Sequence, residues 1–261
     1  MFGFNKQDVR LAVNLFKMNV RDRYLGSSLG SYWAIVNPLL MLAIFTFVFG
    51  FIFKIRLPGS DSTLAYAVWL ISGYGPWIAT NEAIMASSIS VTGAVGIVKN
   101  MAFKSELLPI AAAFVGLISL VVSFCFLLIL MIFDGNYPTW HIFLLPIVVG
   151  AHFFIMISIG IWLSAINVFV RDLTQTLPTL LTIVLYLTPI FYAFESMPKF
   201  IQQISFINPL YQIADSYRRI LVGHQLPNLF GIAYLFSLSF VIFFFGLRAF
   251  RRVKGNFDSA M

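Results

Sequence analysis

The sequence predicts an all-α integral membrane protein, on three observations. In composition, 60% of the 261 residues are hydrophobic and 10% are charged, whereas soluble domains average about 45–50% apolar and about 25% charged residues. Several uncharged stretches are long enough to cross the roughly 30 Å hydrocarbon core of a bilayer, which takes about 20 apolar residues. A basic amphipathic segment precedes the first of these stretches, as expected for a helix that lies at the membrane interface.

The uncharged stretches predict six transmembrane helices within a single domain, residues 1–261. The spans are expected at about 30–53, 64–81, 107–133, 141–167, 173–194 and 227–248. An interface helix is predicted at 8–28, a long loop at 86–106, and two short re-entrant extracytoplasmic helices at 197–222. Most of the 17 Lys and Arg residues fall on the side of the two termini, so the positive-inside rule predicts that both termini are cytoplasmic.

The interface helix leads into the first span through RDRYLGSSLGSYWAIVNPLL, residues 21–40. Its apolar residues recur at helical spacing and its cations share another face, a pattern for which membrane anchoring is the simplest interpretation. Tyr32 and Trp33 stand where an aromatic belt is expected. Pro38 lacks a backbone donor and should kink the span, so we expect the freed carbonyl to face protein or a polar cavity.

Prolines divide the region between the fifth and sixth spans into two short amphipathic pieces, which meet at Pro209. The region is too polar to span a bilayer and too apolar for a free loop. Two short helices that enter the outer leaflet and return are therefore predicted, because backbone at that depth must be buried in protein. The pair Arg218–Arg219 is costly near the membrane unless it faces water, an acidic side chain or a phosphate.

Catalytic and metal-binding patterns are missing from the sequence. The three histidines lack ligand spacing, Cys125 lacks a disulfide partner, and the nearest match to a nucleotide-binding loop, VKNMAFKS, lacks the glycines that cradle a phosphate. We therefore expect no enzymatic site, metal or cofactor in this chain, and ATP only on a separate subunit. The predicted spans contain no Asp or Glu, which disfavours ion-coupled carriers. The net charge of +7 reflects topology rather than nucleic acid binding.

Two residue types within the spans carry further expectations. His152 lies in the middle of a span, where we expect its ring to make an interhelical hydrogen bond. Most of the 29 Phe residues are expected to face lipid or to pack between helices. Aromatic rings could also guide the apolar C–H faces of a sugar chain, since they hold it without strong hydrogen bonds.

Four stretches together resemble the permease subunit of ABC-type polysaccharide exporters, which export lipid-linked O-antigen, capsular polysaccharide and teichoic acid. They are RYLGSSLGSYWAIVNPLLMLAIFTFVFG, FKSELLPIAA, NVFVRDLTQTLPTLLTIVLYLTPIFY and INPLYQIADSYRRILVG, in order over nearly the whole chain. The resemblance implies a homodimer of six-span subunits in a bacterial inner membrane. It also implies two copies of a separate ATPase subunit, which bind ATP and Mg²⁺, a lipid-linked glycan as substrate and contact with membrane lipid, but no nucleic acid.

The resemblance assigns residues to three functional regions. The substrate portal and path are expected at Arg21, Arg23, Tyr24, Tyr32, Trp33, Pro38, Phe45, Phe49, Thr188 and Tyr192. The outer gate is expected at Pro198, Asn208, Pro209, Tyr217, Arg218 and Arg219. The loop at 86–106 becomes a coupling loop that seats on the ATPase, with coupling residues at Gly96, Lys99, Phe103, Lys104, Glu106, Arg171 and Asp172.

Within the portal, the hypothesis is that Arg21 and Arg23 attract the pyrophosphate of a polyprenyl-linked glycan, because paired cations suit a multiply charged phosphate. Tyr32 and Trp33 would then guide the first sugars. O-antigen is the favoured glycan, because the chain is compact and lacks long extracytoplasmic loops.

Other classes remain as alternatives. A related exporter permease for a capsule, a teichoic acid, a drug or a lipid has similar topology. An importer permease needs a glycine six residues after a loop glutamate, where this chain has Ser88 after Glu82. A membrane-embedded transferase needs clustered polar residues near one interface, which the sequence lacks, and a channel needs no ATPase.

Overall fold

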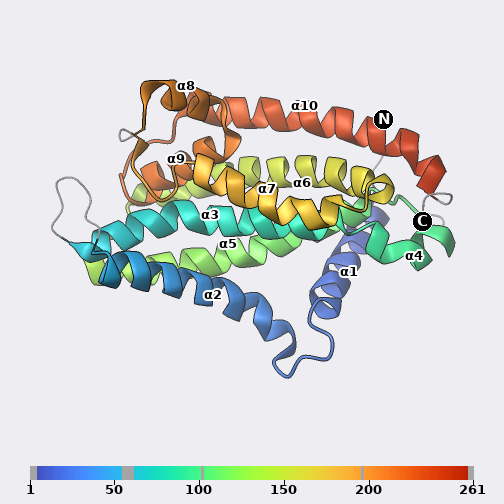
Figure 1. Ribbon diagram of the computed structural model, residues 1–261, viewed down its shortest axis with the longest axis horizontal. Coiled ribbons are helices and arrows are strands. Elements are labelled where there is room, and N and C mark those ends of the chain that lie inside the picture. The colour runs from blue at the N-terminus through green and yellow to red at the C-terminus, as the bar shows by residue number, and fades with distance from the viewer. Residues whose placement is uncertain (1–4, 55–61, 101–102, 195–196, 258–261) are drawn as a thin grey trace.

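Helices α2, α3, α5, α6, α7 and α10 lie along the long axis of the molecule, and α1 runs at a steep angle to them (Figure 1). The structure is a computed structural model that describes residues 5–54, 62–100, 103–194 and 197–257. Over these residues it contains helices and no strand, which confirms the all-α class. The α-helices are α1 (Lys6–Asp22), α2 (Trp33–Phe45), α3 (Thr63–Ser88), α4 (Val95–Asn100), α5 (Leu107–Asp134), α6 (Leu145–Phe169), α7 (Leu173–Leu187), α8 (Lys199–Ile207), α9 (Pro209–Leu221) and α10 (Leu229–Val253).

The two ends of the bundle differ in the elements that they contain. The end of the bundle where α1 begins and α10 finishes also holds α4, and we call it the terminal end (Figure 1). Helices α8 and α9 lie toward the other end, which we call the opposite end. Shorter 3-10 helices include η1 (Gly30–Tyr32), η3 (Thr92–Ala94) and η4 (Trp140–Leu144), and the π-helix η2 (Thr46–Ile52) continues α2 directly.

Four continuous helical stretches are long and apolar enough to cross a membrane, namely Gly30–Ile52, Leu107–Asp134, Trp140–Phe169 and Leu229–Asn256. A fifth candidate is the pair Leu64–Ser88 and Thr92–Val98, which is long and apolar enough if it forms one span and which bends by 46° at its junction. Helix α7 has only 15 residues, or about 22 Å at the usual rise per residue, which is short of a full crossing. The six-span count, the membrane depth of α8 and α9 and the side of the termini therefore stay predictions.

The end of α7 departs from the predicted span at 173–194, because the helix finishes at Leu187. Thr188 takes an extended conformation (ψ 132°), as expected for a residue that precedes a proline, here Pro189. No α-helix follows at residues 188–194. The carbonyl groups that follow α7 consequently need partners from other elements.

Helix α3 also departs from the expected bounds, because it continues through Pro76 to Ser88 instead of stopping near residue 81. Gly75 is a packing position in this helix. A methyl group at Gly75 would lie 2.7 Å from the Cβ atom of Ser123 on α5, and small residues of this kind let helix backbones approach closely in membranes. The extension places Glu82 inside the helix.

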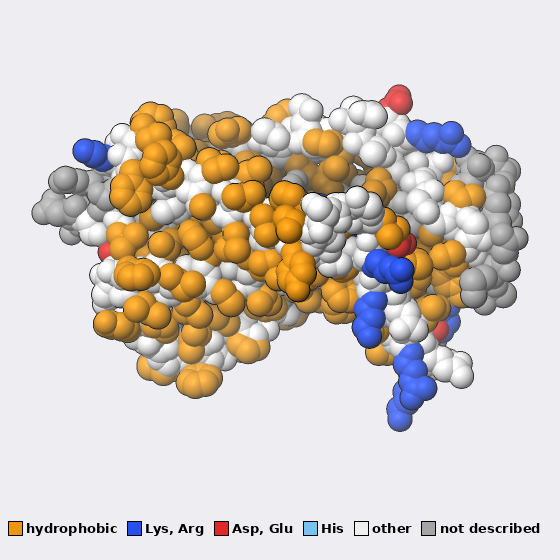
Figure 2. Space-filling view, turned by 90° about the horizontal axis from the view of Figure 1, so that it is seen from below, with side chains coloured by type: hydrophobic (Ala, Val, Ile, Leu, Met, Phe, Trp, Pro, Cys, Tyr) orange, Lys and Arg blue, Asp and Glu red, His pale blue; other side chains and the backbone are white. Residues whose placement is uncertain are grey.

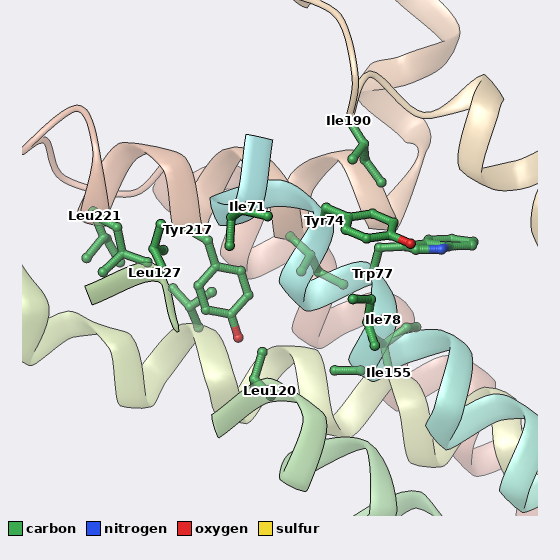
Figure 3. Packing of buried hydrophobic residues seen from close by; sticks show 14 of the residues in the cluster. Ile71, Tyr74, Trp77, Ile78, Leu120, Leu127, Ile155, Ile190, Tyr217 and Leu221 are labelled. Atoms are coloured by element: carbon green, nitrogen blue, oxygen red, sulfur yellow. The ribbon is translucent and has the colours of Figure 1, made fainter. Parts of the chain in front are cut away.

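The core joins α3, α5, α6 and α9. Figure 3 shows side chains from these helices converging, and the labelled members of the cluster are Ile71, Tyr74, Trp77, Ile78, Leu120, Leu127, Ile155, Ile190, Tyr217 and Leu221. Helix α9 therefore packs inside the bundle at the opposite end and does not lie on its surface. By contrast, large hydrophobic side chains cover much of the outer surface in Figure 2, as expected where lipid or another copy replaces water.

His152 confirms the expected interhelical hydrogen bond and makes two of them. Its Nε2 atom lies 2.7 Å from Oγ1 of Thr80 on α3, and its Nδ1 atom lies 3.2 Å from the hydroxyl of Tyr217 on α9. All three side chains are buried. A buried polar group is tolerated only when it is paired, so this chain of hydrogen bonds ties α3, α6 and α9 in one register.

The contact between α3 and α5 predicts a strong effect of Gly116→Ala. The added methyl group would lie 2.4 Å from the backbone oxygen of Ala79 and 2.8 Å from Cβ of Ala83. Because backbone cannot move aside cheaply, we expect the free energy of unfolding to fall by about 1–3 kcal/mol. Thermal unfolding in detergent measures the change, and Gly150→Ala is the control because a methyl group there meets no atom within 4 Å. Equal unfolding temperatures for the two variants would contradict this packing.

Candidate functional site

A groove with a volume of about 520 Å³ lies between α2, α3 and α7. Its lining combines amide groups, one carboxylate, a hydroxyl and aromatic rings. The lining residues are Asn37, Pro38, Met41, Tyr74, Trp77, Ile78, Asn81, Glu82, Thr182 and Leu185. A groove of this composition can hold a ligand that carries both hydroxyl groups and apolar faces, since amides and carboxylates bond hydroxyls and rings pack on C–H groups.

Pro38 is one of the residues that α2 places in the groove. Proline lacks the N–H that would bond the carbonyl of Ala34, so that carbonyl is freed within the helix. Pro38 is buried and lines the groove, and the neighbouring Asn37 side chain is exposed there. The groove is thus a polar cavity beside Pro38, one of the two surroundings expected for the kink, although Ala34 is not among the lining residues.

Glu82 is the charged residue of the groove, and the sequence analysis missed it. One carboxylate oxygen accepts a hydrogen bond from Oγ of Ser119 on α5 at 2.7 Å. The same oxygen lies 3.6 Å from Nη1 of Arg23, just beyond the end of α1. The Glu82 side chain is 13% exposed and that of Arg23 is 38% exposed. This pair connects the corner between α1 and α2 to the central helices α3 and α5.

A signal for Glu82 exists in the sequence. The apolar residues Ala83, Ile84 and Met85 follow it at once, so the helix could have been extended past residue 81. The predicted span at 64–81 stops one residue before Glu82, which leaves the carboxylate outside the predicted helix.

The portal residues do not all lie together. Arg23 reaches the groove through Glu82 and lies 5.7 Å from the ring of Tyr24, which is half-buried. Arg21 is exposed on α1, and Tyr32 is exposed at the start of the first span. In Figure 2 the Lys and Arg side chains gather near α1 while hydrophobic side chains dominate the middle of this face. The structure thus brings Arg23, rather than Arg21, to the groove.

Phe45 and Phe49 belong to an aromatic cluster with Phe191, a residue that follows α7 and that sequence reasoning missed. The ring of Phe191 lies 5.3 Å from that of Phe45 and 5.6 Å from that of Phe49, and Tyr74 lies 4.4 Å from Phe45. Such centroid distances are typical of favourable aromatic pairs. The rings pack on one another and form a wall between α2, α3 and the segment after α7.

The segment after α7 is fixed by side chains from α9. Nδ2 of Asn208 donates a hydrogen bond to Oγ1 of Thr188 at 2.8 Å, while its Oδ1 atom caps α9 by accepting from the N–H of Leu210. Tyr192 donates through its hydroxyl to the carbonyl of Tyr186. Pro209 begins α9, as expected for a residue that needs no N–H at this position.

Arg218 corrects the expectation that it faces water, an acid or a phosphate. Its guanidinium donates hydrogen bonds to the carbonyl oxygens of Pro189 at 2.8 Å and Ile190 at 2.7 Å, and it lies 3.8 Å above the ring of Trp69. These partners suit a planar, weakly hydrated cation at a partly buried site.

The other expected gate residues make contacts that stabilise the fold. Arg219 is paired with Asp215 one turn earlier, at 2.7 Å. Tyr217 lies in the core, where it contacts His152, and Pro198 caps α8.

The coupling segment, residues 103–106, is held from both ends of the chain. Lys104 pairs with Asp8 of α1 at 2.5 Å. Glu106 is buried and pairs with Arg251 near the end of α10 at 2.8 Å. The hydrogen bond from Lys104 lowers the pKa of the Asp8 carboxyl, which keeps it charged. Lys254 adds a hydrogen bond from its Nζ atom to the carbonyl of Phe103.

The other described coupling residues, Gly96, Arg171 and Asp172, are exposed. Gly96 lies in α4, and the side chain of Lys99 falls outside the described ones. Arg171 and Asp172 are exposed in the turn between α6 and α7. Just before that turn, the sequence analysis missed the buried Asn167, which contacts Thr92 and Thr174. Among the described residues no group of His, Cys, Asp or Glu could hold a metal ion.

Apolar helices of membrane-spanning length around a polar groove are typical of a multi-pass membrane protein. The model of the ABC-2 type transporter family matches residues 11–222. The chain therefore belongs to the ABC-2 type transporter family.

Curated relatives match over nearly their full length. The O-antigen export system permease protein RfbA of Myxococcus xanthus is 26% identical over 89% of this chain and 88% of its own length. A protein of the same name from Klebsiella pneumoniae is 27% identical over 95% and 93%. The polysialic acid transport protein KpsM of Escherichia coli is 24% identical over 95% of each chain.

The buried Glu106 carboxylate predicts that Arg251→Met is more harmful than Arg252→Met. Removal of Arg251 leaves a carboxylate that is 4% exposed without its charged partner, which costs about 1–3 kcal/mol or more. Thermal unfolding of the purified protein measures the difference. Arg252 is an exposed neighbour on the same helix and serves as the matched control. Equal losses in the two variants would show that the ion pair does not hold the coupling segment.

Proposed function

We propose that this chain is the membrane-spanning subunit of an ATP-driven exporter of a polyprenyl-pyrophosphate-linked polysaccharide, with O-antigen as the first candidate. Its family membership and its relatives, which are named for O-antigen export and polysialic acid transport, support the substrate class. The observation that carries the proposal is the groove between α2, α3 and α7, where aromatic rings adjoin two amides and a carboxylate. Sugars present hydroxyl groups and apolar faces, and this lining matches both.

In the proposed topology the terminal end is cytoplasmic and the chain crosses the bacterial inner membrane six times. Helix α7 would make the fifth crossing together with residues 188–194, in which the carbonyls of Pro189 and Ile190 accept hydrogen bonds from Arg218. The short helices α8 and α9 would then form the outer gate. The positive-inside pattern of the sequence supports this orientation.

The exposed face of α7 supports a path at the interface between two copies of the chain. Gln175, Thr179, Thr182 and Tyr186 are exposed and recur at helical spacing along one face of this otherwise apolar helix. Polar side chains within a membrane usually face a cavity or another helix rather than lipid. A second copy would turn this face, which adjoins the groove, into the wall of a polar passage.

The Arg23–Glu82 pair supports the portal hypothesis for the pyrophosphate. The separation of 3.6 Å is longer than the roughly 2.7–2.9 Å of a strong charge-assisted hydrogen bond, and the guanidinium is partly exposed. A pyrophosphate is a stronger partner for Arg23 than this carboxylate, since it offers more charge and more acceptor oxygens. Arg21 is exposed in the last turn of α1, two residues before Arg23, and would meet the ligand first.

Two copies of a separate ATPase subunit are proposed to seat on the coupling loop at 86–106 and to bind ATP and Mg²⁺. The loop is clamped to α1 and α10 by Lys104–Asp8 and Glu106–Arg251, so a force on it reaches both elements. Transport rather than enzymatic chemistry is the role of this chain. Capsular polysaccharide is the second candidate substrate, because the relative from Escherichia coli is a polysialic acid transport protein.

Depletion of this protein in its native cell tests the proposed substrate. We expect polyprenyl-linked glycan to accumulate inside the cell while surface polysaccharide falls, because synthesis continues and export stops. Mass analysis of the trapped lipid-linked glycan identifies the polysaccharide. Normal amounts in both pools would contradict glycan export, and a drug or lipid exporter would become the leading alternative.

Charge reversal tests the portal. Arg23→Glu combined with Arg21→Glu is expected to reduce export on the order of tenfold or more, as loss of a charged hydrogen bond predicts, while the complex with the ATPase still assembles. Lys17→Glu changes the same charge on an exposed position of α1 and serves as the control. Export that matches the control would end the portal hypothesis.

A further inference from the structure

Helix α7 is packed lightly along its length and bound firmly at its two ends. Leu177 and Leu181 are its only buried residues, and the residues on its outer face are exposed. In contrast, side-chain hydrogen bonds from three other elements meet at its start and just beyond its end. A helix held in this way can shift as a unit, because little interlocking of side chains opposes it.

At the terminal end, a single amide links three elements. Oγ1 of Thr174, in the first turn of α7, donates to Oδ1 of Asn167 at 2.9 Å. Nδ2 of the same Asn167, on α6, donates to Oγ1 of Thr92 at 3.3 Å. Thr92 begins η3, which runs directly into α4 of the coupling loop. Asn167 is 2% exposed, while Thr92 and Thr174 are half-buried, so the amide is shielded from water at its end of both bonds.

At the opposite end, Arg218 and the α9 cap residue Asn208 bind residues 188–190, which follow α7. Arg218 bonds the carbonyls of Pro189 and Ile190, and Asn208 bonds Thr188. The Arg218 guanidinium cannot easily leave, because it lies against the ring of Trp69 and fills the space beside Gly73, where a methyl group would lie 2.7 Å from Nη2. Movement of the end of α7 must therefore move α9 or break these contacts.

We propose that Asn167 and Arg218 are positioning residues that make α7 a strut between the coupling loop and the outer helices α8 and α9. A displacement of α4 passes through Thr92 and Asn167 to the start of α7, travels along its 15-residue helix, and passes through Arg218 to α9. Helix shifts of about 1–2 Å of this kind are common in switching proteins. The inference rests on the proposed function in one respect, namely that the partner ATPase moves the coupling loop.

The test uses the full complex with its ATPase in lipid nanodiscs, in a Cys125→Ser background with spin labels at Gln203 of α8 and Tyr137, both exposed. We expect ATP to change the distance between the labels in the parent protein. Thr174→Val replaces the hydroxyl by a methyl group and should abolish the distance change. Thr174→Ser keeps the hydroxyl and should keep the distance change. Asn167→Leu should act like Thr174→Val, and Ser164→Ala is the control because Ser164 bonds only within α6, to the carbonyl of Ile161.

Activity gives a second readout in proteoliposomes. Thr174→Val should hydrolyse ATP within about twofold of the parent but export on the order of tenfold less glycan, the size expected for one lost buried hydrogen bond. A merely structural role would lower both activities together with the yield of complex. If Asn167→Leu fails to assemble, the comparison of Thr174→Val with Thr174→Ser still tests the strut.

Several outcomes would overturn the strut. One is a parent protein in which ATP leaves the label distance unchanged, and another is Thr174→Val behaving like Thr174→Ser. The distance needs no glycan, so its outcome is separate from that of the substrate proposal. One outcome separates the two proposals. If the parent complex exports no polysaccharide but shows an ATP-dependent distance change, and if Thr174→Val abolishes that change, the proposed substrate is refuted and the strut is supported.

Discussion

The structure depends on one constraint, which is that a polar group inside an apolar bundle must find its partner within the protein. Unpaired backbone groups in a lipid environment cost several kcal/mol each. The break after Leu187 creates such groups, and Arg218 satisfies two of them from another helix. Once this arginine is committed to the carbonyls, α9 must lie inside the bundle and the end of α7 must lie beside it. Arg218, which the sequence suggested as a contact for water, an acid or a phosphate, is therefore a structural residue that joins α9 to the segment after α7.

The same constraint separates a tight core from a looser periphery. Helices α3 and α5 approach until Gly116 meets the backbone of Ala79, and the hydrogen bonds of His152 fix α6 and α9 against them. Helices α2 and α7 pack on this core along less of their surface, and the polar groove opens between them. The tightly packed α3 thus forms one wall of the groove, and the more lightly packed α2 and α7 form the other.

Charged residues at the terminal end belong to two kinds of contact. Glu106 and Asp8 hold the coupling segment to α10 and α1, and burial or close approach makes these pairs structural. Arg23 and Glu82 are farther apart, at 3.6 Å, which leaves the arginine able to change partner. Distance, rather than residue type, separates a structural ion pair from a candidate ligand contact.

The sequence by itself determined the all-α membrane class, the positions of most long helices and the resemblance to the family, because hydropathy and local motifs act over neighbouring residues. It also placed Pro38 beside a polar cavity and His152 in an interhelical hydrogen bond. Only the tertiary structure decided that α3 continues to Ser88, that Arg218 bonds backbone carbonyls and that Asn167 joins three elements. These outcomes depend on partners far along the chain, such as Ser119 for Glu82 and Trp69 for Arg218. Pairing over such separations is set by how the helices pack, which no local pattern encodes.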